Sequence, residues 1–198
     1  MVSLRSLVVT FLLIDLSAAT AAQNSAIQTE TISGYVRSGP GSFACHIVPE
    51  DVARQMQHPD FPEEFPCMRI GPLEMEMLRS DAEKILGSPA TSVMSGGREA
   101  FLYDLAGDNS GTSYVALTFN RNARVDSLQL TSATEYRGWR FSKIATGDSQ
   151  QALIGTLGRA SLIDEMSKPG VAIWDYSPWS FSFELKDGHV WSIAIWEP

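Results

Sequence analysis

The sequence predicts an α+β fold of two tandem units, each a helix followed by an antiparallel meander, preceded by a disulfide-bounded helical loop. The helix exit at Leu86-Gly87 recurs at Leu157-Gly158, 71 positions later. Tyr103-Asp104 recurs as Trp174-Asp175 at the same offset, and alternating apolar strands follow both pairs. Such self-similarity is typical of a repeated supersecondary unit, although two unrelated α+β halves remain the alternative.

Residues 1–22 are typical of a secretory signal peptide. They combine Arg5, the apolar run Leu7–Ile14 and a small-residue stretch in which Ala19-Thr20-Ala21 fits an A-x-A cleavage signal. The apolar run is too short to cross a bilayer, which needs about 20 residues. We therefore expect a periplasmic or secreted protein after removal of this segment. The alternative is an N-terminal helix of the domain.

The formal net charge of the chain is -8. This acidity argues against binding of nucleic acid or of anionic membrane surfaces, and it favours a basic protein partner. Removal of the signal peptide would leave about 175 residues, which is one ordinary domain or two very small ones. A chain of this size buries about 70% of its unfolded surface and needs no metal to form a core.

Residues 23–44 are polar, contain Gly and Pro and show no sustained hydrophobic period, which predicts a flexible lead-in. Residues 45–68 form a segment bounded by the two cysteines, Cys45 and Cys67. In an exported chain these cysteines are expected to form a disulfide, and closing the loop of 21 intervening residues would contribute about 3 kcal/mol. Pro49 suits the first turn of a short helix inside this loop. A metal or redox pair is the alternative, but the cysteines lack C-x-x-C spacing.

Residues 69–134 form the first predicted unit. Its helix is expected to start near Met75 or at the capping box Ser80 to Glu83, and Gly87 is expected to close it. Three antiparallel strands should follow, at 99–105, 114–119 and 125–130.

Residues 135–198 form the second predicted unit. Its helix should begin near Asp148 to Gln151 and end at Gly158. Strands are expected at 171–176, 179–185 and 190–196. The Asp187-Gly188 pair between the last two strands is a strong hairpin signal.

This unit, with a helix ending in L-G-x-P/A, a strand ending in an aromatic residue and a hairpin ending in V-x-S-I/L, resembles the β-lactamase inhibitory protein-like fold. The same unit occurs in the BamE (SmpA/OmlA) outer-membrane assembly lipoproteins, and the resemblance covers about residues 69–197. It implies a concave sheet surface that binds a protein partner through aromatic and polar side chains. The chain departs from the lipoproteins because it has no lipid-attachment cysteine near the cleavage signal, and the Cys-bounded loop has no counterpart.

Aromatic residues crowd the end of the chain. Phe181 and Phe183 are expected to face the core with Ile193 and Ile195, because alternate strand residues share a face. Aromatic side chains left on an open sheet face are favoured as binding anchors. The predicted partner-binding residues are Tyr103, Trp174, Tyr176, Trp179 and Trp191. Burial in the core is the alternative for each ring.

No catalytic constellation stands out. The three histidines lie in no H-x-x-x-H pattern, there is no G-x-S-x-G elbow, and Asp164-Glu165 looks like a solvated loop face. We expect no enzyme activity, no metal and no cofactor. The sequence thus predicts an exported protein-binding module, with inhibition of a secreted or periplasmic enzyme as one role. A BamE-type envelope scaffold is the alternative, followed by a small-molecule binder or a hydrolase.

Overall fold

The computed structural model describes residues 67–105, 113–177 and 179–197, together with the backbone of four strands nearer the N-terminus. The predicted signal peptide and the helix expected from Pro49 lie outside the described residues. Within the described part, fourteen strands accompany two helices of eight residues. The chain is therefore mainly β, and the predicted α+β class is wrong.

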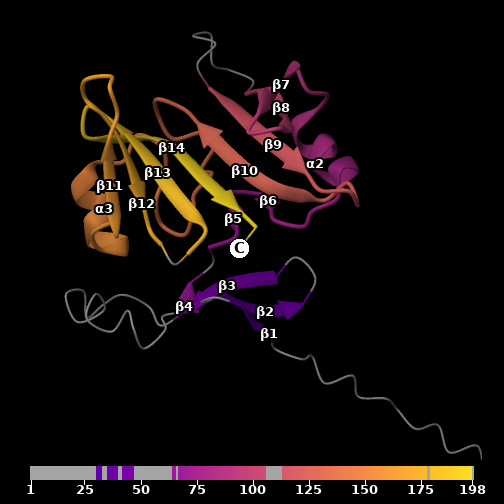
Figure 1. Ribbon diagram of the computed structural model, residues 1–198, viewed down its shortest axis with the longest axis horizontal. Helices are drawn as coiled ribbons and strands as arrows, with labels where there is room; N and C mark the ends of the chain where they lie inside the picture. Colours follow the sequence, from indigo (N-terminus) through magenta and orange to yellow (C-terminus); the bar gives the residue numbers. More distant parts are fainter. Residues whose placement is uncertain are drawn as a thin grey trace, which may run out of the picture.

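One eight-stranded antiparallel sheet dominates the structure (Figure 1). Its order is β11-β12-β13-β14-β10-β9-β8-β7, so β10 and β14 join two four-stranded meanders at the centre. The strands are β7 (Thr91–Ser95), β8 (Arg98–Asp104), β9 (Tyr114–Phe119), β10 (Val125–Thr131), β11 (Leu162–Glu165), β12 (Val171–Asp175), β13 (Phe181–Lys186) and β14 (His189–Trp196). Each meander follows one helix, but descent of the halves from a duplicated unit stays a prediction.

The two edge strands, β7 and β11, explain the error in fold class. The sequence analysis expected three strands in each unit, whereas the structure has four. All four residues of β11 are exposed, and so are Thr91 to Met94 of β7. A strand exposed on both faces has no need of apolar alternation, which is the pattern that reveals strands in a sequence.

The helices α2 (Arg79–Leu86) and α3 (Gln150–Leu157) begin differently. At α3, the Oγ of the N-cap residue Ser149 accepts a hydrogen bond from the backbone N–H of Ala152. At α2, the N-cap is Leu78 and no side chain caps it, so the expected start at Ser80 is wrong. Glu83 of the predicted capping box is engaged elsewhere, because its carboxylate accepts a hydrogen bond from Nε of Arg79. Both helices end, as predicted, at a glycine with positive φ.

The core lies on one face of the sheet. Phe181 is opposite Ile195 and Phe183 is opposite Ile193, and all four side chains are fully buried, as the sequence predicts. Phe141, from the connection between the halves, packs its ring against both phenylalanines. Buried residues of α2 and α3 belong to the same core, so both helices cover this face, near opposite ends of the sheet (Figure 1).

Trp191 departs from the expected alternation. Glu184 pairs with Ser192, whereas the next residue, Leu185, pairs with Val190, so Trp191 is the extra residue of an irregularity in β14. An extra residue shifts the side-chain alternation of a strand. Trp191 therefore does not share the buried position of Ile193, and it is half-buried.

Two smaller sheets precede the large one. β5 (Arg69–Ile70) pairs with β6 (Leu73–Glu74), and a four-stranded sheet has the order β1-β2-β3-β4. The strands of the four-stranded sheet are β1 (Glu30–Ile32), β2 (Tyr35–Gly39), β3 (Ser42–His46) and β4 (Glu64–Phe65). The predicted lead-in 23–44 therefore contains β1, β2 and part of β3. Residue types that favour strands, such as Tyr35, Val36 and Phe43, occur there beside the polar residues.

Candidate functional site

β11 forms an edge of the sheet with an apolar and an acidic half, and no described strand pairs with its outer side. Leu162 is 62% exposed and Ile163 is 45% exposed. β12 pairs with β11 on one side, and β11 ends the sheet on the other. Natural proteins usually protect such edges with lysine, proline or a covering element, because an open edge templates strand addition. No Lys, Arg or Pro lies within β11.

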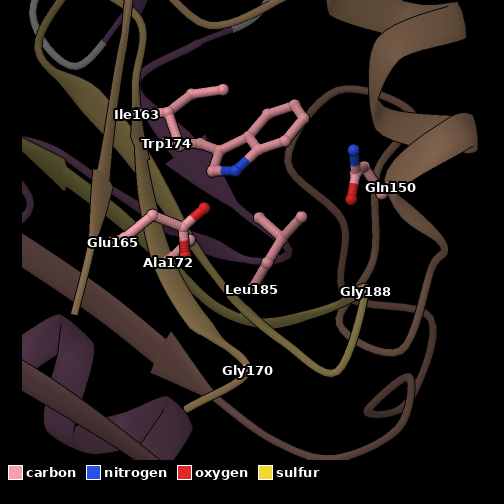
Figure 2. Close-up of a pocket in the computed structure, with 8 residues that line it drawn as sticks. All are labelled: Gln150, Ile163, Glu165, Gly170, Ala172, Trp174, Leu185 and Gly188. Atoms are coloured by element: carbon pink, nitrogen blue, oxygen red, sulfur yellow. The ribbon is translucent and has the colours of Figure 1, made fainter. Parts of the chain in front are cut away.

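A groove of about 260 Å³ opens beside this edge, on the core side of the sheet (Figure 2). Three strands and α3 supply its lining, which consists of Ile163, Glu165, Ala172, Trp174, Leu185 and Gln150, with Gly170 and Gly188 at the strand turns. Figure 2 shows the carboxylate of Glu165 and the amide of Gln150 on opposite sides, with Leu185 between them and the indole of Trp174 above. The groove thus combines an aromatic and aliphatic wall with one carboxylate and one amide.

Backbone hydrogen bonds hold the turns that border the groove. The N–H of Gln150 donates to the carbonyl of Gly188 at 2.9 Å, which ties the start of α3 to the β13–β14 turn. The N–H of Asp187 donates to the carbonyl of Gly170 at 2.7 Å, which ties that turn to the β11–β12 connection. Asp187 and Gly188 both have positive φ, as in the hairpin turn that the sequence predicts. These two hydrogen bonds hold both turns at the border of the groove.

The equivalent space in the first half is filled. There, Cζ of Arg79 lies 4.1 Å from the ring centroid of Phe101 and 5.3 Å from that of Phe119. Gln150 starts α3 as Arg79 starts α2, and Ala172 and Leu185 stand in the second half where Phe101 and Phe119 stand in the first. All three replacements are smaller. The groove exists because these smaller side chains leave the space open.

The electrostatics of the filled half show what this space accommodates. Nε of Arg79 lies 2.7 Å from a carboxylate oxygen of Glu83. This hydrogen bond is the main reason that the pKa of Arg79 is raised, against the lowering effect of burial. The pKa of Tyr103 is raised, mainly by burial and next by the charge of Glu83. The fold therefore holds a guanidinium between aromatic rings and a carboxylate in this half.

The residues of β11 that line the groove direct their backbone groups away from β12, toward the side where no described strand pairs. Met166 donates its N–H to the carbonyl of Val171 at 3.0 Å, so this pair is hydrogen-bonded. Hydrogen-bonded pairs alternate along an antiparallel ladder, which places Asp164 and Leu162 in the bonded pairs. The backbone groups of Ile163 and Glu165 consequently point away from β12.

The five aromatic residues predicted to bind a partner lie mostly in the core. Tyr103 and Tyr176 are fully buried, Trp179 and Trp174 nearly so, and Trp191 is half-buried. The Tyr176 hydroxyl donates to the carbonyl of Gly158, at the end of α3. Because a buried ring offers no surface, these residues are not carried into the proposed site, except for Trp174 as part of the groove wall.

Trp191 is partly covered as well. Nζ of Lys186 lies 4.5 Å from the centroid of its ring. The structure thus does not bring Trp191 together with Tyr103 or Trp174 as one exposed aromatic surface.

The structure describes only one of the two cysteines with its side chain, Cys67. Cys67 is fully buried and is not a free thiol. The side chain of Cys45 lies outside the described residues, so the Cys45–Cys67 pairing stays a prediction. In the described part of the chain, no three His, Cys, Asp or Glu side chains come together as metal ligands. None of the helices described there is long and apolar enough to cross a membrane.

The sequence pattern does not identify Ile163, Glu165 and Gln150 as site residues. It predicts Asp164-Glu165 as a solvated loop face and Gln150 as part of a helix start. The available signal was the apolar pair Leu162-Ile163 directly before two acidic residues. Together these four residues make a short strand with an apolar and an acidic end.

Comparisons with known proteins give little guidance. No protein-family model and no curated protein matches the chain. Two similar solved structures are a DUF4309 family protein (YjgB) from Bacillus subtilis and a cysteine-rich secretory protein from Staphylococcus aureus. The first is 12% identical over 65% of this chain and 81% of its own, with a TM-score of 0.41. The second is 10% identical over 62% of this chain and 44% of its own, with a TM-score of 0.40. Neither likeness assigns a fold or a function, and the resemblance to the inhibitory protein-like fold stays a prediction.

Proposed function

We propose that this chain is an exported, non-enzymatic protein-binding module that captures an extended segment of another protein along β11. The exposed edge of β11, with its apolar and acidic halves, carries the proposal. An extended segment that adds to a sheet edge gains backbone hydrogen bonds, while pockets beside the edge select its side chains. The signal peptide pattern of residues 1–22 supports export.

The dimensions of the groove favour a side chain over a free small molecule. Small-molecule sites usually measure about 300–1,000 Å³, and the groove measures about 260 Å³. It also lies directly beside β11, two of whose residues line it. A side chain of an added strand would enter this groove from the edge.

Self-association along β11 is the competing use of the same edge. The net charge of -8 opposes close approach of two copies, whereas it attracts a basic partner. We therefore assign the edge to a different protein.

The test compares the two edges of the sheet. Leu162→Glu with Ile163→Glu alters β11, and Met94→Glu with Val93→Glu alters β7 by the same change in charge. The residues are comparably exposed, since Val93 is 46% and Met94 71% exposed. The wild-type chain and both variants serve as tagged bait for an extract of the envelope and the medium. A stoichiometric partner that the β11 variant loses and the β7 variant keeps is the expected result.

Equal capture by both variants would refute the assignment to β11. The partner recovered with the wild type then defines the role. An enzyme whose activity falls on binding makes the chain an inhibitor, and outer-membrane assembly components make it a scaffold. Concentration-dependent dimerisation of the wild type that the β11 variant lacks, measured by sedimentation equilibrium, would replace the proposed partner with a second copy.

A further inference from the structure

From the groove we infer the chemistry of the captured segment: it carries a basic side chain, Arg or Lys, that enters the groove between Glu165 and Trp174. This inference rests on the proposed function and names the partner class of the same site. It adds a specificity rule, because strand addition alone recognises only backbone.

The register between β11 and an added strand determines where the basic residue of that strand lies. The backbone groups of Glu165 point away from β12, so an added strand would pair with Glu165. Residues opposite each other in paired strands project to the same face and interact. The partner residue opposite Glu165 therefore projects toward the groove, and the residue two positions away lies beside the exposed side chain of Ile163. The recognised pattern is a basic residue and an apolar residue separated by one position.

Reach favours a long side chain. Neighbouring strands lie about 4.8 Å apart. Trp174 is on β12, so the floor of the groove lies two strand spacings from an added strand. Arg and Lys have long stems that lie along apolar surface while their charged ends reach polar groups. The apolar side chains of Ile163 and Leu185 offer that surface.

Charge favours a cation. Glu165 is the acidic residue of the lining, and no Lys or Arg of the described residues lines the groove. An indole and a carboxylate together suit a cation, because the ring face attracts positive charge and the carboxylate pairs with it. In the first half, the side chain of Arg79 fills the equivalent space, lies over Phe101 and contacts Glu83, so a cation is accommodated there. A partner side chain would fill the space in the second half, with Glu165 of β11 rather than a helix residue as its carboxylate.

The experiment uses short fluorescein-labelled peptides of alternating Thr and Val that differ only in the central residue, which is Arg, Lys, Gln or Glu. Their affinities for the full mature chain are measured by fluorescence anisotropy at low and at raised ionic strength. We expect the Arg and Lys peptides to bind about three- to tenfold more tightly than the Gln peptide, the range for an ion pair partly removed from water. The difference should shrink as salt screens the charges.

Variants of the chain assign the preference to the groove. Glu165→Gln should remove the preference for the Arg peptide over the Gln peptide. Glu165→Arg should reverse the order and favour the Glu peptide. Glu99→Gln is the matched control, since Glu99 is an exposed carboxylate of the other half, on β8, and it should change nothing.

The outcomes separate this inference from the proposed function. Equal affinity for all four peptides, with binding lost in the Leu162→Glu and Ile163→Glu variant, would overturn the basic specificity and keep strand addition. A preference for Arg that survives Glu165→Gln would also overturn the inference, because the preference would then come from elsewhere. Absence of binding by every peptide, together with partner capture unchanged in the β11 variant, would overturn both.

Discussion

Ile163 lies directly opposite Trp174 in the β11–β12 pair, yet Ile163 is 45% exposed and Trp174 is 5% exposed. Both side chains project to the core face of the sheet, because opposite residues share a face. The sheet therefore passes from core to surface within one strand spacing. The groove occupies this boundary.

Truncation of Trp174 and truncation of Ile163 should change the free energy of unfolding by different amounts. Trp174→Ala removes a large buried side chain and should lower the free energy of unfolding by about 3–5 kcal/mol. Ile163→Ala removes an exposed side chain and should change it by less than about 1 kcal/mol. Urea unfolding followed by circular dichroism measures both. Similar losses for the two variants would show that β11 is packed rather than open.

Tyr103→Phe should not destabilise the protein. Among the described residues, the Tyr103 hydroxyl is a buried side-chain oxygen without a hydrogen-bond partner. An unsatisfied buried polar group costs about 1–3 kcal/mol. Its removal should therefore leave the free energy of unfolding unchanged or raise it by about 1 kcal/mol. A loss above 1 kcal/mol in urea unfolding would mean that the hydroxyl has a stabilising partner.

The raised pKa of Tyr103 predicts that the free energy of unfolding depends on pH in the alkaline range. Burial raises the pKa of Tyr103 above its ordinary value of 10.0, so the neutral phenol is favoured in the folded state. The stability that this raised pKa contributes is fully present below the pKa of Tyr103 in the unfolded chain. It is lost as the pH rises through the pKa of Tyr103 in the folded protein. Wild-type stability should thus fall more steeply than that of Tyr103→Phe above about pH 10. Parallel curves from urea unfolding at each pH would contradict this linkage.

Gly71→Ala should be costly for two reasons. Gly71 has a φ of +57°, and an added Cβ would lie 2.5 Å from Cγ of Trp139. Gly87 is the control, because it also has positive φ, but an added Cβ would meet no described atom within 4 Å beyond the glycine itself and its chain neighbours. Both alanine variants incur backbone strain of about 1–2 kcal/mol, and Gly71→Ala should lose a further 1–3 kcal/mol, approximately, from overpacking. Thermal unfolding with matched scan rates compares them, and equal losses would show that Trp139 moves aside freely.

The two helix starts also differ in a way that stability can test. Ser149→Ala removes the oxygen that accepts from the Ala152 N–H, and it should cost about 0.5–2 kcal/mol. Ser80→Ala is the control, since Ser80 lies inside α2 rather than at its N-cap, and Ala suits a helix interior. Urea unfolding should show a loss for the first variant alone. A comparable loss at Ser80 would restore the capping box that the sequence suggests.

Much of the strand and helix pattern was accessible from local signals. The burial of Phe181, Phe183, Ile193 and Ile195 follows from two-residue alternation, which depends on neighbouring residues only. Gly87 and Gly158 mark helix ends for an equally local reason, the positive φ that glycine tolerates. The Asp187-Gly188 turn belongs to the same group.

The candidate site was not accessible in this way. Tyr103, Tyr176 and Trp179 are residue types that often anchor binding, yet all three are buried. Whether a side chain is buried depends on which helices and loops cover its face of the sheet. Glu165 looked like a solvated residue because its significance comes from Trp174 and Leu185 on other strands. Spacing along the chain carries no information on such neighbours.

The amino-acid sequence alone thus determines the central strands, the helix ends and the acidic character of this chain. Propensity, alternation and charge are properties of short stretches, so they can be recognised without the tertiary structure. Packing between residues far apart in the sequence decided three other features. These are the pairing of β10 with β14 in one sheet, the exposure of both sheet edges, and the groove beside β11. Smaller residues at Gln150, Ala172 and Leu185 open that groove only because the fold brings those three positions together.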